Sequence, residues 1–180
     1  MKNRPGREGI VDPVTIIVPV KDEEAGLEYL LGDFRKSSLN ELYEVRFIFI
    51  IDIRTSDASK KIASQFSDVI IDQKSTTGKG AAVKQAVDYW KNDTSPLVIF
   101  LDADGSYSFD SVISIIDVLK DGADVASGSR FISGGRRPEG MRQLHIFGNR
   151  ILSMISSFRN RRKISDLCTG LWGFQEKALL

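Results

Sequence analysis

Two aspartates, Asp102 and Asp104, lie two residues apart directly after the apolar run Leu97–Leu101. A run of this length and composition, preceded by Pro96, predicts a fully buried strand. Ligands of open α/β sheets bind beyond the carboxyl ends of the strands. Mg²⁺ typically binds one or two carboxylates together with phosphate oxygens of a substrate. The pair therefore indicates a divalent metal and diphosphate site, the alternative being a strand that ends in two solvated acids and a turn glycine.

Charged residues follow other apolar runs as well. Glu23 comes after the run Val14–Val20, and Asp52 comes after Arg46–Ile51. Lys79 lies in a Gly-Lys-Gly turn at the expected start of a helix, where free N–H groups and the positive end of the helix dipole suit a phosphate. An acidic rim with one lysine suits a nucleoside diphosphate held through a metal, with a further carboxylate accepting from base or ribose donors. A glycine turn with a solvated lysine is the alternative for that segment.

Several other functional classes are disfavoured by the sequence. No G-x-G-x-x-G follows the first apolar run, which argues against a dinucleotide site. A P-loop needs glycine where Gln73 stands and Ser or Thr where Gly80 stands, so an ATPase or GTPase is not predicted. The single cysteine, Cys168, allows no internal disulfide and no cysteine-based metal site. No apolar stretch has the length of a membrane span.

Strand and helix patterns alternate along the chain, which predicts an α/β fold with a mostly parallel sheet and helices on both faces. Its 180 residues suit a single domain, and the polar residues 1–12 are expected to form a flexible segment before it. Strands are expected at Val14–Val20, Arg46–Ile51, Val69–Ile71, Leu97–Leu101, Asp124–Ser129 and Gly170–Phe174. Helices are expected at Glu24–Ser37, Ala58–Phe66, Gly80–Trp90, Phe109–Lys120 and Met141–Phe158.

Six segments, in order, resemble those of the family 2 glycosyltransferases, and together they cover nearly the whole chain. Each motif is weak alone, whereas the ordered set is specific. The resemblance is greatest to the branch of dolichyl-phosphate mannose synthases and dolichyl-phosphate glucosyltransferases. The segments are Val18-Pro19-Val20-Lys21-Asp22-Glu23, Asp52-Ile53-Arg54-Thr55-Ser56-Asp57, Gly78-Lys79-Gly80-Ala81-Ala82, Asp102-Ala103-Asp104, Gly128-Ser129-Arg130-Phe131 and Ser165-Asp166-Leu167-Cys168-Thr169-Gly170.

This resemblance implies a GT-A fold and the inverting, metal-dependent transfer of a sugar from a UDP- or GDP-sugar, with Mg²⁺ or Mn²⁺ as cofactor. It implies that Asp102 and Asp104 bind the metal and that Asp104, Asp166 and Arg130 are catalytic, the last two lying near the acceptor. The residues implied in binding the nucleotide sugar are Pro19, Val20, Lys21, Glu23, Asp52, Lys79, Asp102 and Ala103.

The chain departs from the family pattern at several positions. Ile53 and Arg54 stand where the second aspartate and the glycine of the family turn belong, which leaves recognition of the base open. Lys21 stands where an aromatic residue is frequent, and Ser106 stands where many relatives have a glutamine metal ligand, so water is expected to complete the metal shell. The sequence ends at Leu180, whereas relatives continue, and we expect a shortened chain or a minimal catalytic module.

Basic residues gather late in the chain, with nine Arg or Lys and a single acid, Glu139, between Arg130 and Lys163. This asymmetry suits an anionic partner. Together with the resemblance, it predicts a polyprenyl phosphate acceptor at the cytosolic face of a membrane, with a peripheral enzyme and no nucleic acid partner. Arg130 and Arg142 would bind the acceptor phosphate. A phosphate needs no strong base, whereas a sugar hydroxyl would require one, for which Asp166 is the candidate.

Three alternatives stay open at this point. The first is a glycosyltransferase that acts on a sugar hydroxyl of a polysaccharide or glycolipid. The second is a sugar-phosphate nucleotidyltransferase, although the acidic residues after the first strand argue against the glycine-rich, basic loop of that class. The third is a catalytically inactive module that binds a nucleotide sugar, which Ile53 and Arg54 favour and the intact Asp102 and Asp104 disfavour.

Overall fold

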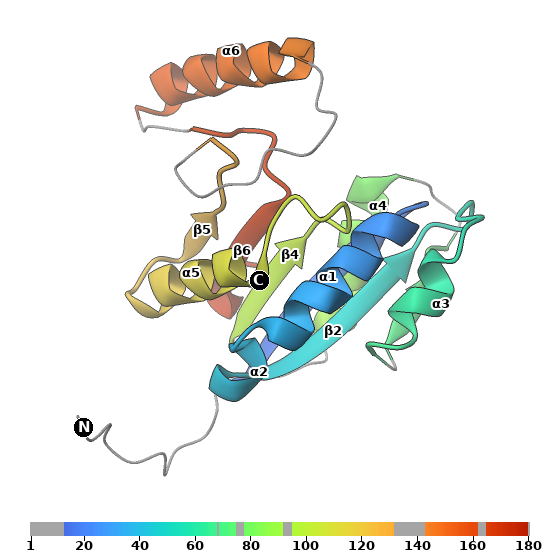
Figure 1. Cartoon of the computed structure of the whole chain (residues 1–180). Coiled ribbons are helices and arrows are strands. Elements are labelled where there is room, and N and C mark those ends of the chain that lie inside the picture. Colours follow the sequence, from blue (N-terminus) through green and yellow to red (C-terminus); the bar gives the residue numbers. More distant parts are fainter. Residues whose placement is uncertain are drawn as a thin grey trace, which may run out of the picture.

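A six-stranded sheet with helices on both faces forms the body of the protein (Figure 1). The computed structural model describes residues 13–67, 69–74, 78–91, 95–131, 143–161 and 165–179. The strands are β1 Pro13–Val20, β2 Glu44–Ile51, β3 Ile70–Asp72, β4 Leu97–Leu101, β5 Val125–Ser127 and β6 Leu171–Gln175. The helices are α1 Glu24–Lys36, α2 Leu39–Leu42, α3 Ser59–Ala63, α4 Lys79–Trp90, α5 Phe109–Lys120 and α6 Gln143–Asn160, followed by a 3-10 turn at Glu176–Ala178.

The sheet is mostly parallel, as the alternation of strands and helices predicts. Its order is β3-β2-β1-β4-β6-β5; β1 pairs in parallel with β2 and β4, whereas β6 runs antiparallel to both β4 and β5. The chain builds outward from β1 to β3 and then returns to place β4 on the other side of β1. In sheets of this kind, ligands bind at such a point of reversal, beyond the carboxyl ends of the strands.

Both faces of the sheet are covered, so its central strands consist mostly of apolar residues, and β2 is apolar and buried from Phe47 to Ile51. On one face, Ile16 and Val18 pack in a core with residues of α1 and α5. On the other face, Ile17 packs with Trp90 of α4. Four phenylalanines, with ring centroids of neighbouring pairs 4.9 to 6.1 Å apart, reinforce the first core; they are Phe34, Phe47, Phe66 and Phe109. This packing holds the strand ends, and hence the residues that follow them, in fixed positions.

The ends of several elements differ from those expected. The helix expected over Ala58–Phe66 is α helix only over Ser59–Ala63, because the amides of Gln65 and Phe66 bond to carbonyls three residues back. Such bonds tighten the last turn of a helix. Helix α2, Leu39–Leu42, was not expected at all. The expected segment 1–12, the loop Ile132–Gly140 and Arg142 lie outside the described residues.

Helix α6 lies apart from the layers that cover the sheet (Figure 1). It is attached to the segment before β6, because Leu167 donates its amide to the Ser153 hydroxyl at 2.9 Å and Cys168 donates its amide to the Asn149 side chain at 3.2 Å. Its outer side exposes large apolar residues, with Phe158 at 89% exposure. Within the part of the chain that the structure describes, no helix has the length and apolar character needed to cross a membrane.

Candidate active site

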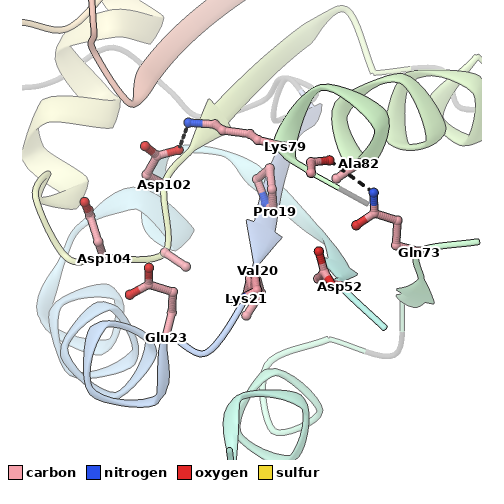
Figure 2. A pocket seen from close by; sticks show the side chains of 12 residues that line it. Pro19, Val20, Lys21, Glu23, Asp52, Gln73, Lys79, Ala82, Asp102 and Asp104 are labelled. Carbon is pink, nitrogen blue, oxygen red and sulfur yellow. Dashed lines mark hydrogen bonds and ion pairs between the residues drawn. The ribbon is translucent and has the colours of Figure 1, made fainter. Parts of the chain in front are cut away.

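A pocket of about 230 Å³ opens beyond the carboxyl ends of β1 and β4, where the order of the strands reverses (Figure 2). The structure brings nine residues singled out in the sequence together in its lining: Pro19, Val20, Lys21, Glu23, Asp52, Lys79, Asp102, Ala103 and Asp104. Gln73, Gly78 and Ala82 also line it. The expectation that functional residues directly follow the strands, called here the strand-end rule, therefore leads to one cavity.

One end of the pocket is acidic. Glu23, at the start of α1, faces the turn that carries Asp102 and Asp104 after β4 (Figure 2). Burial raises the pKa of Glu23, and the negative charges of Asp104 and Asp102 raise it further. Burial likewise raises the pKa of Asp102, although Lys79 opposes the shift. Carboxylates that repel one another in this way are stabilised by a bound cation.

The turn that carries the acidic pair is supported from both sides. Asp104 accepts a hydrogen bond from the Ser106 amide at 2.9 Å, and Gly105 takes a φ of +72°, which glycine adopts without strain. Asp33 of α1 accepts the amide of Phe109 at the start of α5 at 2.7 Å. Helix α1 therefore fixes the segment that connects the acidic turn to α5.

Lys79 is the basic group of the pocket. It is the first residue of α4, and it forms an ion pair with Asp102 (Figure 2). The two side chains are 58% and 30% exposed, so solvent screens the pair and the lysine is held weakly. Gly78, with φ +103°, turns the chain into the helix and leaves its free N–H groups beside the pocket. A diphosphate placed here would meet both the lysine and the helix terminus.

The opposite end of the pocket contains Asp52 and Gln73 (Figure 2). Asp52 is 4% exposed and pairs with Arg54 through two contacts, Nη2 to Oδ2 at 2.9 Å and Nε to Oδ1 at 3.0 Å. Hydrogen bonds from Arg54 hold the pKa of Asp52 well below its usual range. The Gln73 side chain is buried and donates to the Gly78 carbonyl at 3.1 Å. Two residues of the turn that begins at Asp52 depart from the family pattern. Arg54 pairs with Asp52, whereas Ile53 is 59% exposed.

The donor set fits a hard divalent cation. Among the described residues, no group of three or more His, Cys, Asp or Glu is arranged to hold a metal by itself. Asp102 and Asp104 instead offer two carboxylates in an open pocket, with Lys79 on one of them. Mg²⁺ commonly binds in this manner, through one or two carboxylates with substrate phosphates and water completing its shell.

Arg130 and Asp166 lie outside the pocket lining and bind each other. Arg130 contacts the carboxylate through Nε at 2.8 Å, Nη2 at 2.9 Å and its backbone amide at 3.1 Å. Asn149 of α6 adds a fourth donor at 2.6 Å. The Asp166 side chain is fully buried and that of Arg130 is 11% exposed. The pair therefore joins the loop after β5 to α6 and to the segment before β6.

This geometry limits the chemistry of Asp166. Burial alone would raise its pKa, but the ion pair with Arg130 and the hydrogen bond from Asn149 outweigh burial and lower it. A carboxylate with a low pKa and four donors is a weak base. The arrangement favours a positioning role for Asp166 over proton transfer. Asn149 has no counterpart in the sequence analysis, because a single polar residue inside a helix pattern gives no signal.

The sequence profile of glycosyl transferase family 2 matches residues 15–180. The chain belongs to this family. Among its relatives, glycosyltransferase AglJ of Haloferax volcanii is 28% identical over 169 residues, which cover 94% of this chain and 52% of AglJ. The dolichyl-phosphate hexose transferase of the same organism is 26% identical over 168 residues, 93% of this chain and 68% of that protein. This family 2 chain thus spans about half the length of AglJ.

The fold agrees with this assignment. Glucosyl-3-phosphoglycerate synthase of Mycobacterium tuberculosis, solved with Mn²⁺, UDP-glucose and phosphoglyceric acid, superposes with a TM-score of 0.66 at 15% identity. The superposition covers 92% of this chain and 57% of that one. The GT-A fold expected for the family 2 chain is therefore confirmed.

One residue of the family 2 pocket was missed although a signal was present. Gln73 follows β3 directly, as Asp52 follows β2 and Asp102 follows β4. The strand-end rule applied to every strand would have included it. Arg142, expected to bind an acceptor phosphate, lies outside the described residues.

Proposed function

We propose that this chain transfers a sugar from a nucleoside diphosphate sugar to a polyprenyl phosphate. The observation that carries the proposal is the polarity of the pocket, with Asp102, Asp104 and Lys79 at one end and Asp52 and Gln73 at the other. A UDP- or GDP-sugar has matching parts, a diphosphate that a cation and a lysine can bind and a base that offers hydrogen-bonding groups. Membership of glycosyl transferase family 2 supports the same donor class.

The reaction is a single displacement at the anomeric carbon. An oxygen of the acceptor phosphate forms a bond to C1 while the bond from C1 to the nucleoside diphosphate breaks, and the electron pair leaves with the diphosphate oxygen. One displacement inverts the configuration at C1. Mg²⁺ or Mn²⁺ held by Asp102 and Asp104 would supply positive charge that offsets the charge of the leaving group. Lys79, once released from Asp102, adds a second positive charge to the same oxygens.

The state of Asp166 supports a phosphate acceptor. A sugar hydroxyl needs a general base to become nucleophilic, and Asp166 has four donors and a lowered pKa. A phosphate monoester has a second pKa near 6 and is already largely a dianion at neutral pH. The name of the relative that acts as a dolichyl-phosphate hexose transferase agrees with this acceptor class.

Helix α6 provides the surface for a lipid acceptor. Met154, Ile155 and Phe158 are 66%, 55% and 89% exposed on it, and Arg159 and Arg161 follow at its end. Large exposed apolar residues beside arginines suit an anionic membrane surface, in which apolar side chains enter the interface and basic residues approach the headgroups. We therefore place the protein at the cytosolic face of a membrane, with α6 toward the lipid.

The test follows transfer of a radiolabelled sugar from a panel of UDP- and GDP-sugars to a short polyprenyl phosphate, with Mn²⁺ or with EDTA. Asp104→Asn removes one metal-binding charge at nearly constant size and should abolish Mn²⁺-dependent transfer and weaken diphosphate binding at least tenfold. Asp117→Asn, an exposed aspartate on α5, is the matched control and should match the wild type. Transfer to a soluble sugar hydroxyl alone would exclude the lipid acceptor, and nucleotide binding without any transfer would identify an inactive module.

A further inference from the structure

Arg54 is held by Asp52, which lines the end of the pocket proposed for the nucleoside. The amide of Arg54 donates to Asp52 Oδ1 at 2.9 Å, and its guanidinium donates to the same carboxylate through Nε and Nη2. The backbone amide of Gly78 also acts as a donor toward Asp52 and lowers the pKa of its carboxyl group. A carboxylate has about four acceptor positions. Asp52 is therefore nearly saturated, and a base could form a strong hydrogen bond to it only by displacing one of these donors.

The guanidinium, in contrast, keeps part of its capacity. Arginine has five N–H donors in a planar fork, and two of them bond to Asp52. Among the described residues, no side chain or carbonyl accepts from the other three. The Arg54 side chain is 54% exposed, whereas that of its partner is 5% exposed. The carboxylate of Asp52, which lines the pocket, thus fixes one edge of the guanidinium, and the other edge is exposed next to that residue.

We propose that Arg54 is the residue that recognises the nucleobase, and that Asp52 positions it. The free edge of the guanidinium donates, so it suits a base that presents a carbonyl oxygen. Guanine offers O6 beside N7, and uracil offers O4, whereas adenine places an amino donor beside N7. Adenine would therefore set donor against donor. The proposal rests on the proposed function, because it names the base specificity of the same donor site.

The experiment measures the Kd of GDP, UDP and ADP by calorimetry in the presence of Mn²⁺. The wild type should bind GDP or UDP roughly tenfold or more tightly than ADP, because a good bidentate contact discriminates by that order. Arg54→Ala should reduce this ratio to within about threefold. Arg54→Lys keeps a charge near Asp52 but lacks the fork, so it should also lose the ratio while retaining most of the thermal stability.

Lys60→Ala provides the matched control. Lys60 is also 54% exposed and also pairs with an aspartate, Asp72, at 2.7 Å, but Asp72, unlike Asp52, does not line the pocket. This variant should keep the wild-type ratio. An unchanged ratio in Arg54→Ala, or tighter binding of every nucleotide by that variant, would overturn the assignment, since the latter means that Arg54 only competes for Asp52. No binding of any nucleotide by the wild type would instead overturn the proposed function and this proposal with it.

Discussion

Gly26 of α1 lies directly against the turn that carries the acidic pair. A Cβ added at Gly26 would lie 2.1 Å from the Ala103 carbonyl oxygen and 2.8 Å from the Asp104 Cα. Both atoms belong to backbone, which cannot rotate away as a side chain can. Gly32, six residues later in the same helix, has nothing within 4 Å of such a Cβ. The two glycines therefore offer the same substitution in one helix, with and without a collision at the site.

The two substitutions are expected to change the free energy of unfolding in opposite directions. Alanine is favoured over glycine in a helix by about 0.5–1 kcal/mol, so Gly32→Ala should stabilise the protein by up to that amount. Gly26→Ala has the same advantage, but overpacking typically costs about 1–3 kcal/mol. For a chain of this size, 1 kcal/mol corresponds to about 2–4 °C in Tm. We expect Gly26→Ala to melt several degrees below Gly32→Ala.

The effect on the site separates positioning from stability. To relieve the clash, α1 or the turn must move by about an ångström. Misplacement of functional groups on that scale can lower a reaction rate by up to about a hundredfold where geometry is critical. Calorimetric titration with UDP or GDP and Mn²⁺, below the Tm of each variant, should show at least a tenfold loss of affinity for Gly26→Ala and no change for Gly32→Ala. Equal affinities and equal melting temperatures would refute the contact between α1 and the acidic turn.

Two further predictions concern α6 and its attachment. Asp166→Asn should lower stability by about 3 kcal/mol at neutral pH, because it breaks a buried pair with Arg130. The folded pKa of Asp166 is lowered, so its contribution is complete above the unfolded value near 3.8 and is lost as the pH falls through the folded pKa. Thermal melts of variant and wild type should therefore differ at about pH 4 and converge only at a pH below the folded pKa of Asp166. Phe158→Ser should weaken sedimentation with anionic vesicles roughly tenfold or more, since burying a phenylalanine contributes about 1.5–3 kcal/mol, and it should leave Tm unchanged. Val118→Ser, at an exposed apolar position of α5, should alter neither, and loss of vesicle binding there would refute a specific role for α6.

Much of the fold follows from periodicity alone. Long apolar runs fill most of β1, all of β4 and the second half of β2, and a sheet covered on both faces requires such runs. Sheets of this kind are mostly parallel. The antiparallel pairing of β6 with β4 does not follow from the sequence, because strand direction depends on how the segment from 128 to 170 returns. Helix α2 escaped notice because its four residues are shorter than any window in which periodicity can be measured.

The residues that line the pocket could be predicted from the sequence, whereas the ion pairs among them could not. The carboxyl ends of parallel strands meet at one edge, so residues directly after β1, β2 and β4 had to lie together. The ion partners of these residues depend instead on rotamers and on turns that no short pattern specifies. Arg54 is an example, since it stands out in the sequence only as a departure from the family turn, whereas in the structure it saturates Asp52.

Two ion pairs, Lys79–Asp102 in the pocket and Arg130–Asp166 outside its lining, differ in exposure, and this difference assigns their roles. Lys79 and Asp102 are both substantially exposed, so their pair contributes little and can open to admit a cation and a diphosphate. Arg130 and Asp166 are almost fully buried, and separating them would leave an uncompensated charge inside the protein. Arg130 also donates to the Cys168 carbonyl through Nη2, so among the described residues only its Nη1 donors are uncommitted. An acceptor phosphate would then contact only the Nη1 edge of Arg130, whose charge Asp166 already compensates. Most of the electrostatic attraction for the phosphate would therefore come from other cations.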